Sequence, residues 1–361
     1  MNKIGKYAIQ MVLYALTLLA CAGILLFAVR RGASMPLGVV CLGLSVLLAG
    51  ILHEGGHILA GSLLGMRLVS VTLFCLKITL NQRGKAEVEW VNPFLADALG
   101  ATCMYPESPE NMKRRFLWYS IGGVAANAAW AVIVLVLCLI FRRNGYVWAT
   151  LGMTLPYTVY LILVNGLPVF DEGRYDGALF FGLIRDDPAQ LAMTHILTIQ
   201  GYMAEGRAPA EIDVDLYFDL PQLREDDETF GLLHLFRYYY LMDSGQEQRA
   251  FSAVSRLEDC MEYVPEEYAP AIYSELAFIY ALRGNGTKAE GFIKRLEEGR
   301  EKSVESFRAR LAYALLTGRT EEKRDLYEQA KEELKYAQPG MKKFERKMMK
   351  RIFVSLPPAN S

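Results

Sequence analysis

Four apolar stretches in the first half of the chain are each long enough to cross a lipid bilayer. They cover residues 7–29, 36–64, 116–141 and 146–168, and charged or turn residues bound each one. A helix needs about 20 apolar residues to span the hydrocarbon core of a membrane. Because backbone polar groups in lipid must be satisfied within the protein, we expect these stretches to be helices. The sequence therefore predicts an all-α transmembrane domain of four helices over residues 1–185.

The first stretch has a second interpretation, as a cleaved signal peptide. Leu18-Leu19-Ala20-Cys21 resembles a lipoprotein cleavage box. Apolar residues nevertheless continue from Ala22 to Val29, and the run is long for the apolar core of a signal peptide. We therefore expect a retained helix.

Basic residues flank the predicted helices unevenly. With four spans, the N-terminus, the loop 65–115 and the C-terminal segment lie on one side of the membrane. The N-terminus and this loop carry Lys3, Lys6, Arg67, Lys77, Arg83, Lys85, Lys113, Arg114 and Arg115, whereas the opposite side carries Arg30, Arg31, Arg142 and Arg143. Since basic loops tend to stay in the cytoplasm, we predict a multi-pass protein of the cell membrane whose N-terminus and C-terminal domain are cytoplasmic.

Overall charge and cysteine content exclude two further classes of protein. The net charge is -1, so the chain lacks the basic excess of a protein that binds nucleic acid. The six cysteines are scattered and form no CxxC pair, which is typical of reduced cysteines that pack in a core rather than of a disulfide framework.

Within the loop after the second apolar stretch, residues 68–92 alternate polar and apolar side chains around Asn81–Gly84. This pattern predicts a small β-hairpin insertion beside the membrane-embedded site.

The main chemical signal lies near the end of the second apolar stretch, where residues 53–57 read HEGGH. On a helix, His53 and His57 are one turn apart and can reach the same metal ion. Glu54 lies at the edge of that face, where it is placed to take a proton from an attacking water rather than to bind the metal. Zinc in such a site polarises the carbonyl of the substrate and lowers the pKa of a bound water toward roughly 7.

A structural cluster of polar residues is the alternative reading of the same motif. Polar side chains in lipid are energetically costly, so they usually face a partner or a cavity. Gly55 and Gly56 each reduce helix propensity by about 1 kcal/mol, and close packing against a neighbouring helix would compensate for both.

A catalytic zinc site usually has three protein ligands, so one ligand must come from elsewhere in the chain. His195 and His234 lie in the charged second half and are poor candidates. The better candidates are Asp171 and Asp176, which follow the fourth apolar stretch, where Pro168 must break the helix. Irregular backbone at membrane depth is tolerated where it lines a cavity.

Three motifs in this order resemble those of the site-2 protease family of intramembrane zinc metalloproteases. They are HEGGH at 53–57, Gly122-Gly123-Val-Ala-Ala-Asn127, and Asn165-x-x-Pro168 followed by either Asp-x-Gly or Asp-Gly. The resemblance covers roughly residues 35–185. It implies a core of three helices with two histidines and one aspartate on zinc, and cleavage of a membrane protein substrate in or near a transmembrane segment. It also implies that Asn127 and Asn165 help to bind substrate; the alternative is that they join helices by hydrogen bonds.

The sequence departs from the family pattern at two places. Gly123 stands where proline is usual, and position 173, where the family pattern would place the aspartate, is Gly. We favour Asp176 as the third ligand because Asp176-Gly177 keeps the dipeptide and leads into an apolar helix, with Asp171 as the alternative. Both departures leave open a catalytically inactive relative that serves as a membrane scaffold for protein partners.

The second half of the chain is charged and predicts a soluble helical region. Residues 186–228 contain several prolines and acids and resemble a linker with short helices. Over residues 229–361, helices end at Gly245, Gly284 and Gly318, at spacings of 39 and 34 residues. These spacings are close to the period of tetratricopeptide helical hairpins, whereas a plain helical bundle is the alternative. A hairpin array would offer a surface for a cytoplasmic protein, either a substrate or a regulator.

Overall fold

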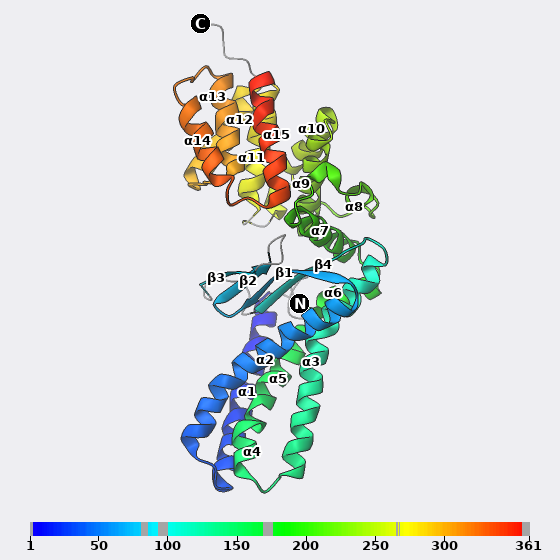
Figure 1. The fold of residues 1–361 in the computed structure, drawn as a ribbon, viewed down its shortest axis with the longest axis vertical. Helices are drawn as coiled ribbons and strands as arrows, with labels where there is room; N and C mark the ends of the chain where they lie inside the picture. Colours follow the sequence, from blue (N-terminus) through cyan, green and yellow to red (C-terminus); the bar gives the residue numbers. More distant parts are fainter. Residues whose placement is uncertain are drawn as a thin grey trace. The chain divides into compact units, whose positions relative to one another are not determined.

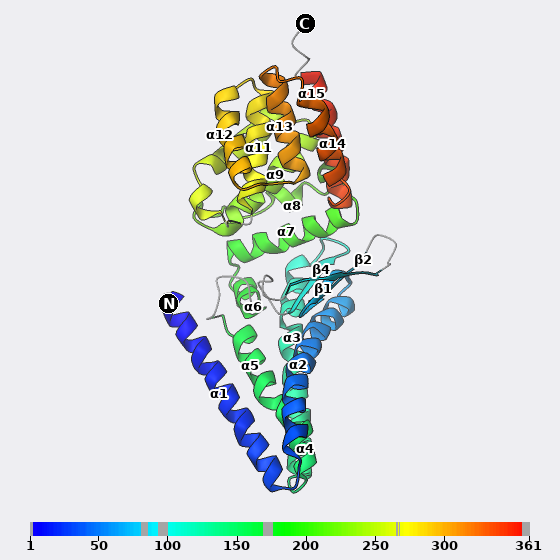
Figure 2. The same cartoon turned by 90° about the vertical axis from the view of Figure 1, so that its left-hand side faces the viewer.

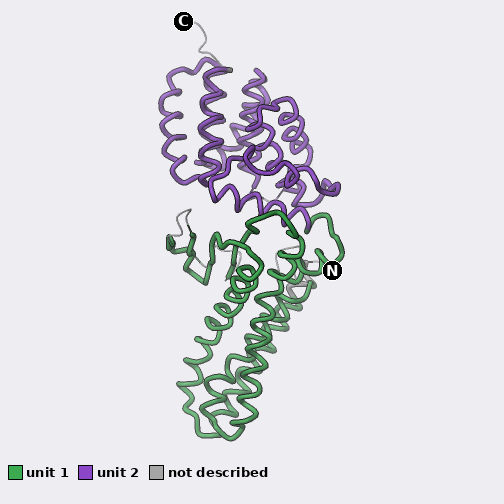
Figure 3. The backbone as a smooth tube through the Cα atoms, turned by 45° about the vertical axis from the view of Figure 1, so that its right-hand side comes forward, with its two compact units in different colours: residues 1–190 green, residues 191–361 purple. Residues whose placement is uncertain are grey.

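The computed structural model describes residues 3–80, 86–92, 100–168, 176–264, 266 and 268–355. The chain forms two compact units, residues 1–190 and residues 191–361, which Figure 3 shows in different colours. The first unit contains the long apolar helices and a small sheet. The second unit consists of shorter helices.

Four helical segments of the first unit are long and apolar enough to cross a membrane. They are α1 (Lys3–Arg30), α2 (Met35–Leu63), α3 (Met112–Ile140), and an interrupted segment made of α4 (Gly145–Thr150), η1 (Gly152–Thr154) and α5 (Leu155–Gly166). Large apolar side chains remain exposed on these helices, for example Met11 at 69% and Leu63 at 78%. Such continuous apolar surface is costly in water and suggests association with a membrane. The prediction of four apolar helices is confirmed, with ends that differ by a few residues.

A four-stranded antiparallel sheet replaces the single hairpin that the sequence predicts. Its strands are β1 (Met66–Leu73), β2 (Leu76–Leu80), β3 (Ala86–Trp90) and β4 (Gly100–Pro106), in the order β3-β2-β1-β4. The stretches expected to pair on either side of that turn, 69–74 and 86–90, lie mainly in β1 and β3, which do not pair with each other because β2 lies between them; the expected turn at 81–84 lies outside the described residues. Figures 1 and 2 show the sheet, the start of α1 and helix α6 (Asp176–Ile184) at one end of the helical bundle, with the α1–α2 and α3–α4 turns at the other.

Glycine permits the close approach of α2 and α3. A Cβ atom added at Gly56 would lie 2.4 Å from the carbonyl oxygen of Gly122, and one added at Gly122 would lie 2.7 Å from the carbonyl oxygen of Gly56. The expected packing role is therefore confirmed for Gly56. It is wrong for Gly55, which is exposed and has no atom within 4 Å of an added Cβ.

Helix α6 begins where it packs against the end of α5. A Cβ atom at Gly177 would lie 2.4 Å from the carbonyl oxygen of Gly166, so only glycine fits this approach without a shift. Helix α5 ends before Pro168, as the sequence predicts. This contact places the first residue of α6, Asp176, beside the other helices of the first unit.

The regular secondary structure described in the second unit is all helical. Its elements are α7 (Pro188–Ala204, from residue 191), η2 (Pro209–Glu211), α8 (Asp215–Phe218), α9 (Glu228–Asp243), α10 (Glu247–Ser255), η3 (Arg256–Glu258), η4 (Met261–Tyr263), α11 (Ala269–Leu282), α12 (Gly286–Glu298), α13 (Val304–Leu316), α14 (Lys323–Glu333) and α15 (Pro339–Ser355). The segment 186–228 is not a linker, because α7 and α8 bury residues such as Ile196, Tyr202 and Tyr217 in the core of this unit.

The predicted turn glycines end three of these helices. Gly245, Gly284 and Gly318 have positive φ angles of 79°, 74° and 75°, a conformation that glycine adopts without strain. They separate α9 from α10, α11 from α12, and α13 from α14, so the second unit contains three successive helical hairpins followed by α15.

Candidate metal centre

Two buried histidines lie on one face of α2. Their i, i+4 spacing places the ring centroids of His53 and His57 4.9 Å apart, and the two residues are 6% and 4% exposed. Their Nε2 atoms lie 3.3 Å from each other. The sequence-based prediction that both rings turn toward a common point is confirmed.

Asp176 supplies the third atom of the cluster from the first turn of α6. Its Oδ2 lies 3.0 Å from Nε2 of His53 and 3.2 Å from Nε2 of His57. The three residues could hold a metal ion. Of the two acids that the sequence suggests, Asp176 is therefore next to the histidines, and Asp171 lies outside the described residues.

These three potential ligand atoms, the two Nε2 atoms and Oδ2 of Asp176, form a triangle whose side lengths fit a tetrahedral metal site. Nitrogen and oxygen ligands at 2.0–2.1 Å from a tetrahedral metal ion lie about 3.3–3.4 Å from one another. The observed separations of 3.0, 3.2 and 3.3 Å are close to that value. Three ligands on one side leave a fourth position for water or substrate.

The hydrogen-bond partner of Nδ1 determines which ring nitrogen of His57 can bind a metal. Nδ1 of His57 lies 2.8 Å from the backbone carbonyl oxygen of Tyr119, which can only accept a hydrogen bond. Nδ1 must therefore carry the proton, and Nε2 keeps its lone pair for a metal. Such a partner is typical of histidine ligands in metal sites.

Asn127 is next to the corresponding nitrogen of His53. Its Nδ2 lies 3.3 Å from Nδ1 of His53, and its buried Oδ1 has no hydrogen-bond partner. A half-turn of the amide brings Oδ1 to Nδ1 instead, so that the ring donates there and Nε2 keeps its lone pair. The structure thus places Asn127 beside a histidine of the cluster, where it can orient the ring; its role in substrate binding stays a prediction.

Glu54 is buried next to the histidines but is not part of the triangle. It is 5% exposed, and Oγ1 of Thr102 on β4 donates a hydrogen bond of 2.7 Å to its Oε2. A Cβ atom at Gly100 would lie 2.5 Å from Oε1, so the start of β4 covers the carboxyl group closely. The sheet thus lies beside the site, as the sequence predicts.

Gly123 lies directly against the two imidazole rings. A Cβ atom at this position would lie 2.5 Å from Nε2 of His57 and 2.8 Å from Cε1 of His53. No side chain fits there while the rings keep their positions. The glycine that departs from the expected family motif is therefore the residue that this arrangement of rings requires.

The remaining predicted residues are not part of the cluster. Nδ2 of Asn165 donates to the carbonyl oxygen of Leu161 in its own helix, at 3.1 Å. Nδ1 of His195 bonds the carbonyl oxygen of Leu216, and that of His234 bonds the carbonyl oxygen of Phe230, so both belong to the second unit as expected.

Sequence reasoning missed the contributions of Thr102, Gly100 and Tyr119. Thr102 is 48 residues from Glu54, and Tyr119 acts through its backbone carbonyl, which no side-chain motif reveals. Comparison with models of protein families, with curated proteins and with solved structures finds no match to this chain.

Proposed function

We propose that this chain is an intramembrane zinc metalloprotease of the site-2 protease type. It would hydrolyse a peptide bond in or near a transmembrane segment of a membrane protein. The proposal rests mainly on one observation: three potential ligand atoms converge within 3.3 Å of each other, next to a buried glutamate, among helices apolar enough to cross a membrane.

Each residue of the site has a distinct role in this proposal. His53, His57 and Asp176 would hold the ion through Nε2, Nε2 and Oδ2. Zinc, when bound, would polarise the scissile carbonyl and the attacking water. Glu54 takes the proton of that water and delivers it to the leaving amine, while the hydroxyl group of Thr102 holds its carboxyl group in place.

The residues around the site also orient its ligands. The Tyr119 carbonyl and Asn127 set the ring nitrogens of the two histidines, and Asn127 and Asn165 are proposed to contact the substrate backbone. The helical hairpins of the second unit would bind a cytoplasmic partner, either a substrate or a regulator. The orientation that puts this unit in the cytoplasm follows from the basic residues alone.

Metal content and cleavage test the proposal separately. The full chain, purified in lipid nanodiscs, is assayed for bound zinc and for cleavage of a panel of single-span membrane peptides. We expect one zinc per chain in the parent and in Glu54→Gln, and loss of zinc in His53→Ala. Cleavage should fall by at least about 10²-fold in Glu54→Gln, because it lacks the base that moves the proton.

Two outcomes would contradict these roles. Cleavage by Glu54→Gln at the parent rate would exclude Glu54 as the base. A folded parent that takes up no zinc would exclude the enzyme and would favour the alternative, an inactive membrane scaffold that binds protein partners.

A further inference from the structure

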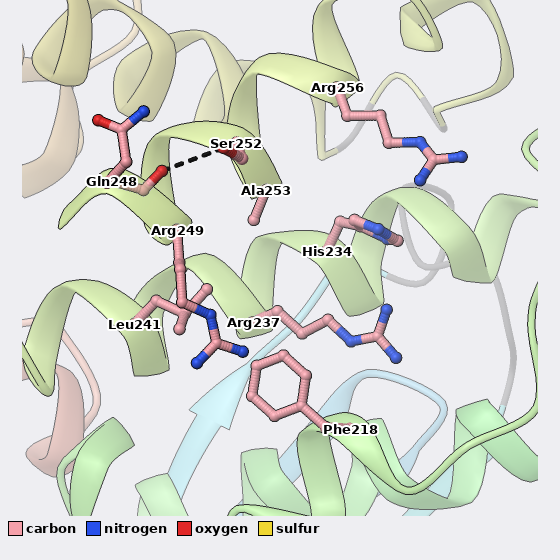
Figure 4. Close-up of a pocket in the computed structure, with 9 residues that line it drawn as sticks. All are labelled: Phe218, His234, Arg237, Leu241, Gln248, Arg249, Ser252, Ala253 and Arg256. Carbon is pink, nitrogen blue, oxygen red and sulfur yellow. Dashed lines mark hydrogen bonds between the residues drawn. The ribbon is translucent and has the colours of Figure 1, made fainter. Parts of the chain in front are cut away.

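A second polar site lies in the helical unit, in a pocket between α9 and α10. The pocket has a volume of about 340 Å³, and Figure 4 shows the side chains that line it. Three arginines from successive elements line it: Arg237 on α9, Arg249 on α10 and Arg256 at the start of η3. All of its lining residues belong to residues 191–361, so the pocket lies within one compact unit.

An aromatic ring forms part of the pocket wall and holds two of the arginines. The guanidinium carbons of Arg237 and Arg249 lie 5.4 Å and 5.7 Å from the ring centroid of Phe218, and Figure 4 shows both side chains reaching this ring. Leu241 adds apolar surface. Contact with a ring restricts the guanidinium groups before any ligand arrives, which reduces the entropy lost on binding.

Two of the three arginines, Arg237 and Arg249, have no acidic partner among the described residues. Nε of Arg256 donates to Oε1 of Glu225 at 3.1 Å. Among the residues that the structure describes, no carboxylate forms an ion pair with Arg237 or Arg249. Their contacts are with neutral acceptors: Nε of Arg237 donates to the carbonyl oxygen of Tyr217 at 2.6 Å, and Nη1 of Arg249 donates to Oε1 of Gln246 at 2.5 Å.

His234 adds no charge to the pocket at neutral pH. Its ring is buried and lies 4.0 Å from the Phe230 ring, and its Nδ1 donates to the Phe230 carbonyl oxygen. Burial lowers the pKa of His234 to about 4, and the nearby charges of Arg237 and Arg256 add to this effect. With Arg256 neutralised by Glu225, the pocket keeps two positive charges, those of Arg237 and Arg249.

We propose that this pocket binds a phosphate monoester carried on a small apolar group. Two guanidinium groups match the charge of a phosphate monoester, which is about -1.5 to -2 at neutral pH. Arginine also pairs with phosphate oxygens through two parallel hydrogen bonds. The volume is near the lower end of the range for small-molecule pockets, which starts at about 300 Å³. The Phe218 ring and Leu241 would contact the group that carries the phosphate.

Phenyl phosphate is a suitable probe because it combines a phosphate monoester with one small ring. We expect saturable binding to the full chain in nanodiscs, measured by isothermal titration calorimetry, and no saturation with phenol. A peptide bearing phosphotyrosine identifies the source of the ligand: tighter binding of the peptide indicates a phosphorylated side chain, and tighter binding of phenyl phosphate indicates a free small molecule.

A matched pair of variants tests the location. Arg249→Gln removes one unpaired guanidinium group and should weaken phenyl phosphate binding about tenfold or more. Arg295→Gln is the control, because Arg295 is also exposed and lies over the rings of Tyr273 and Phe292, but outside the pocket. Its affinity should equal that of the parent.

Three results would overturn the proposal. They are the absence of saturation by phenyl phosphate up to about 1 mM, equal binding of phenol and phenyl phosphate, and equal losses of affinity in Arg249→Gln and Arg295→Gln. Because the assay measures binding to the second unit, its failure would leave the proposed protease site untouched.

Discussion

Small residues around the two imidazole rings determine what the metal cluster can do. Gly123 leaves room for the rings of His53 and His57, and Thr102 fixes one oxygen of Glu54. Neither residue binds a metal or moves a proton itself. Both act on the position of a group that does, and sites of this kind tolerate displacements of only about 0.5 Å.

Replacing Gly123 by alanine should disrupt the metal site while leaving the protein folded. The new Cβ would lie 2.5 Å from Nε2 of His57, so the ring must move and the three-atom triangle must open. We expect zinc content to fall well below one per chain, with a cost in stability of about 1–3 kcal/mol. Elemental analysis measures the zinc content, and thermal unfolding followed by circular dichroism measures the stability.

The control is Gly43→Ala on the exposed face of α2. It has no atom within 4 Å of the new methyl group and should keep its zinc. Retention of zinc by both variants would contradict the predicted role of Gly123.

Thr102→Val should reduce cleavage without removing the metal. Valine keeps the shape and the strand propensity but loses the 2.7 Å hydrogen bond to Glu54. Hydrogen bonds to charged groups contribute about 1.5–3 kcal/mol, which corresponds to roughly 10–100-fold in rate. Zinc content should equal that of the parent. Thr72→Val in the neighbouring strand β1 tests whether any threonine in the sheet has this effect; an equal loss there would show that Thr102 has no special role.

At the scale of elements, the close packing of α2 against α3 places the two histidines of α2 beside the site residues of α3. The sequence predicts α2 and α3 well because apolar length is a strong local signal. It does not predict β4, because this strand pairs, within the described residues, with β1, whose partner residues lie 27–40 positions earlier, for example Val71 with Thr102. It also misreads 186–228 as a linker, since proline and acid content hides the buried face of α7.

The two neighbouring glycines of the motif should respond in opposite ways to alanine. Gly55→Ala places a methyl group in open space and should stabilise α2 by up to about 1 kcal/mol. Gly56→Ala places it 2.4 Å from the Gly122 carbonyl oxygen and 2.7 Å from the Ala126 Cβ, so α2 and α3 must separate. Thermal unfolding in one detergent should give a higher midpoint for the first variant and a lower one for the second. Equal midpoints would contradict the close helix contact.

At the scale of the whole chain, both units bury ionisable groups, and the sequence predicts them unequally. In the first unit, the i, i+4 spacing predicts the pair of histidines, and the resemblance to a family suggests the aspartate, which the contact of α6 with α5 then brings into place. In the second unit, Arg308 on α13 is fully buried between Glu275 on α11 and Glu345 on α15, at 2.6 Å from each. No local pattern predicts this ion pair network, because each partner is more than 30 residues from Arg308.

One guanidinium group facing two buried carboxylates should make the stability of the second unit depend on pH. Burial raises the pKa of Glu345 to about 8; Arg308 opposes this shift, and the charges of Glu305 and Glu275 add to it. An unfolded glutamate titrates near 4.3. Between these values unfolding releases a proton, so the free energy of unfolding falls as pH rises through this window, by up to about 1.4 kcal/mol per pH unit, and levels off above pH 8.

Glu345→Gln isolates this contribution, because glutamine resembles the protonated acid and does not titrate. Thermal unfolding of the full chain between pH 5 and 9 should show the midpoint of the variant gaining on that of the parent as pH rises, with the difference complete near pH 8. Glu332→Gln is the control, since Glu332 is an exposed acid paired with Lys335 at the surface. It should follow the parent at every pH. A constant difference between Glu345→Gln and the parent would mean that Glu345 stays ionised in the folded chain, and that Arg308 stabilises both carboxylates as charges.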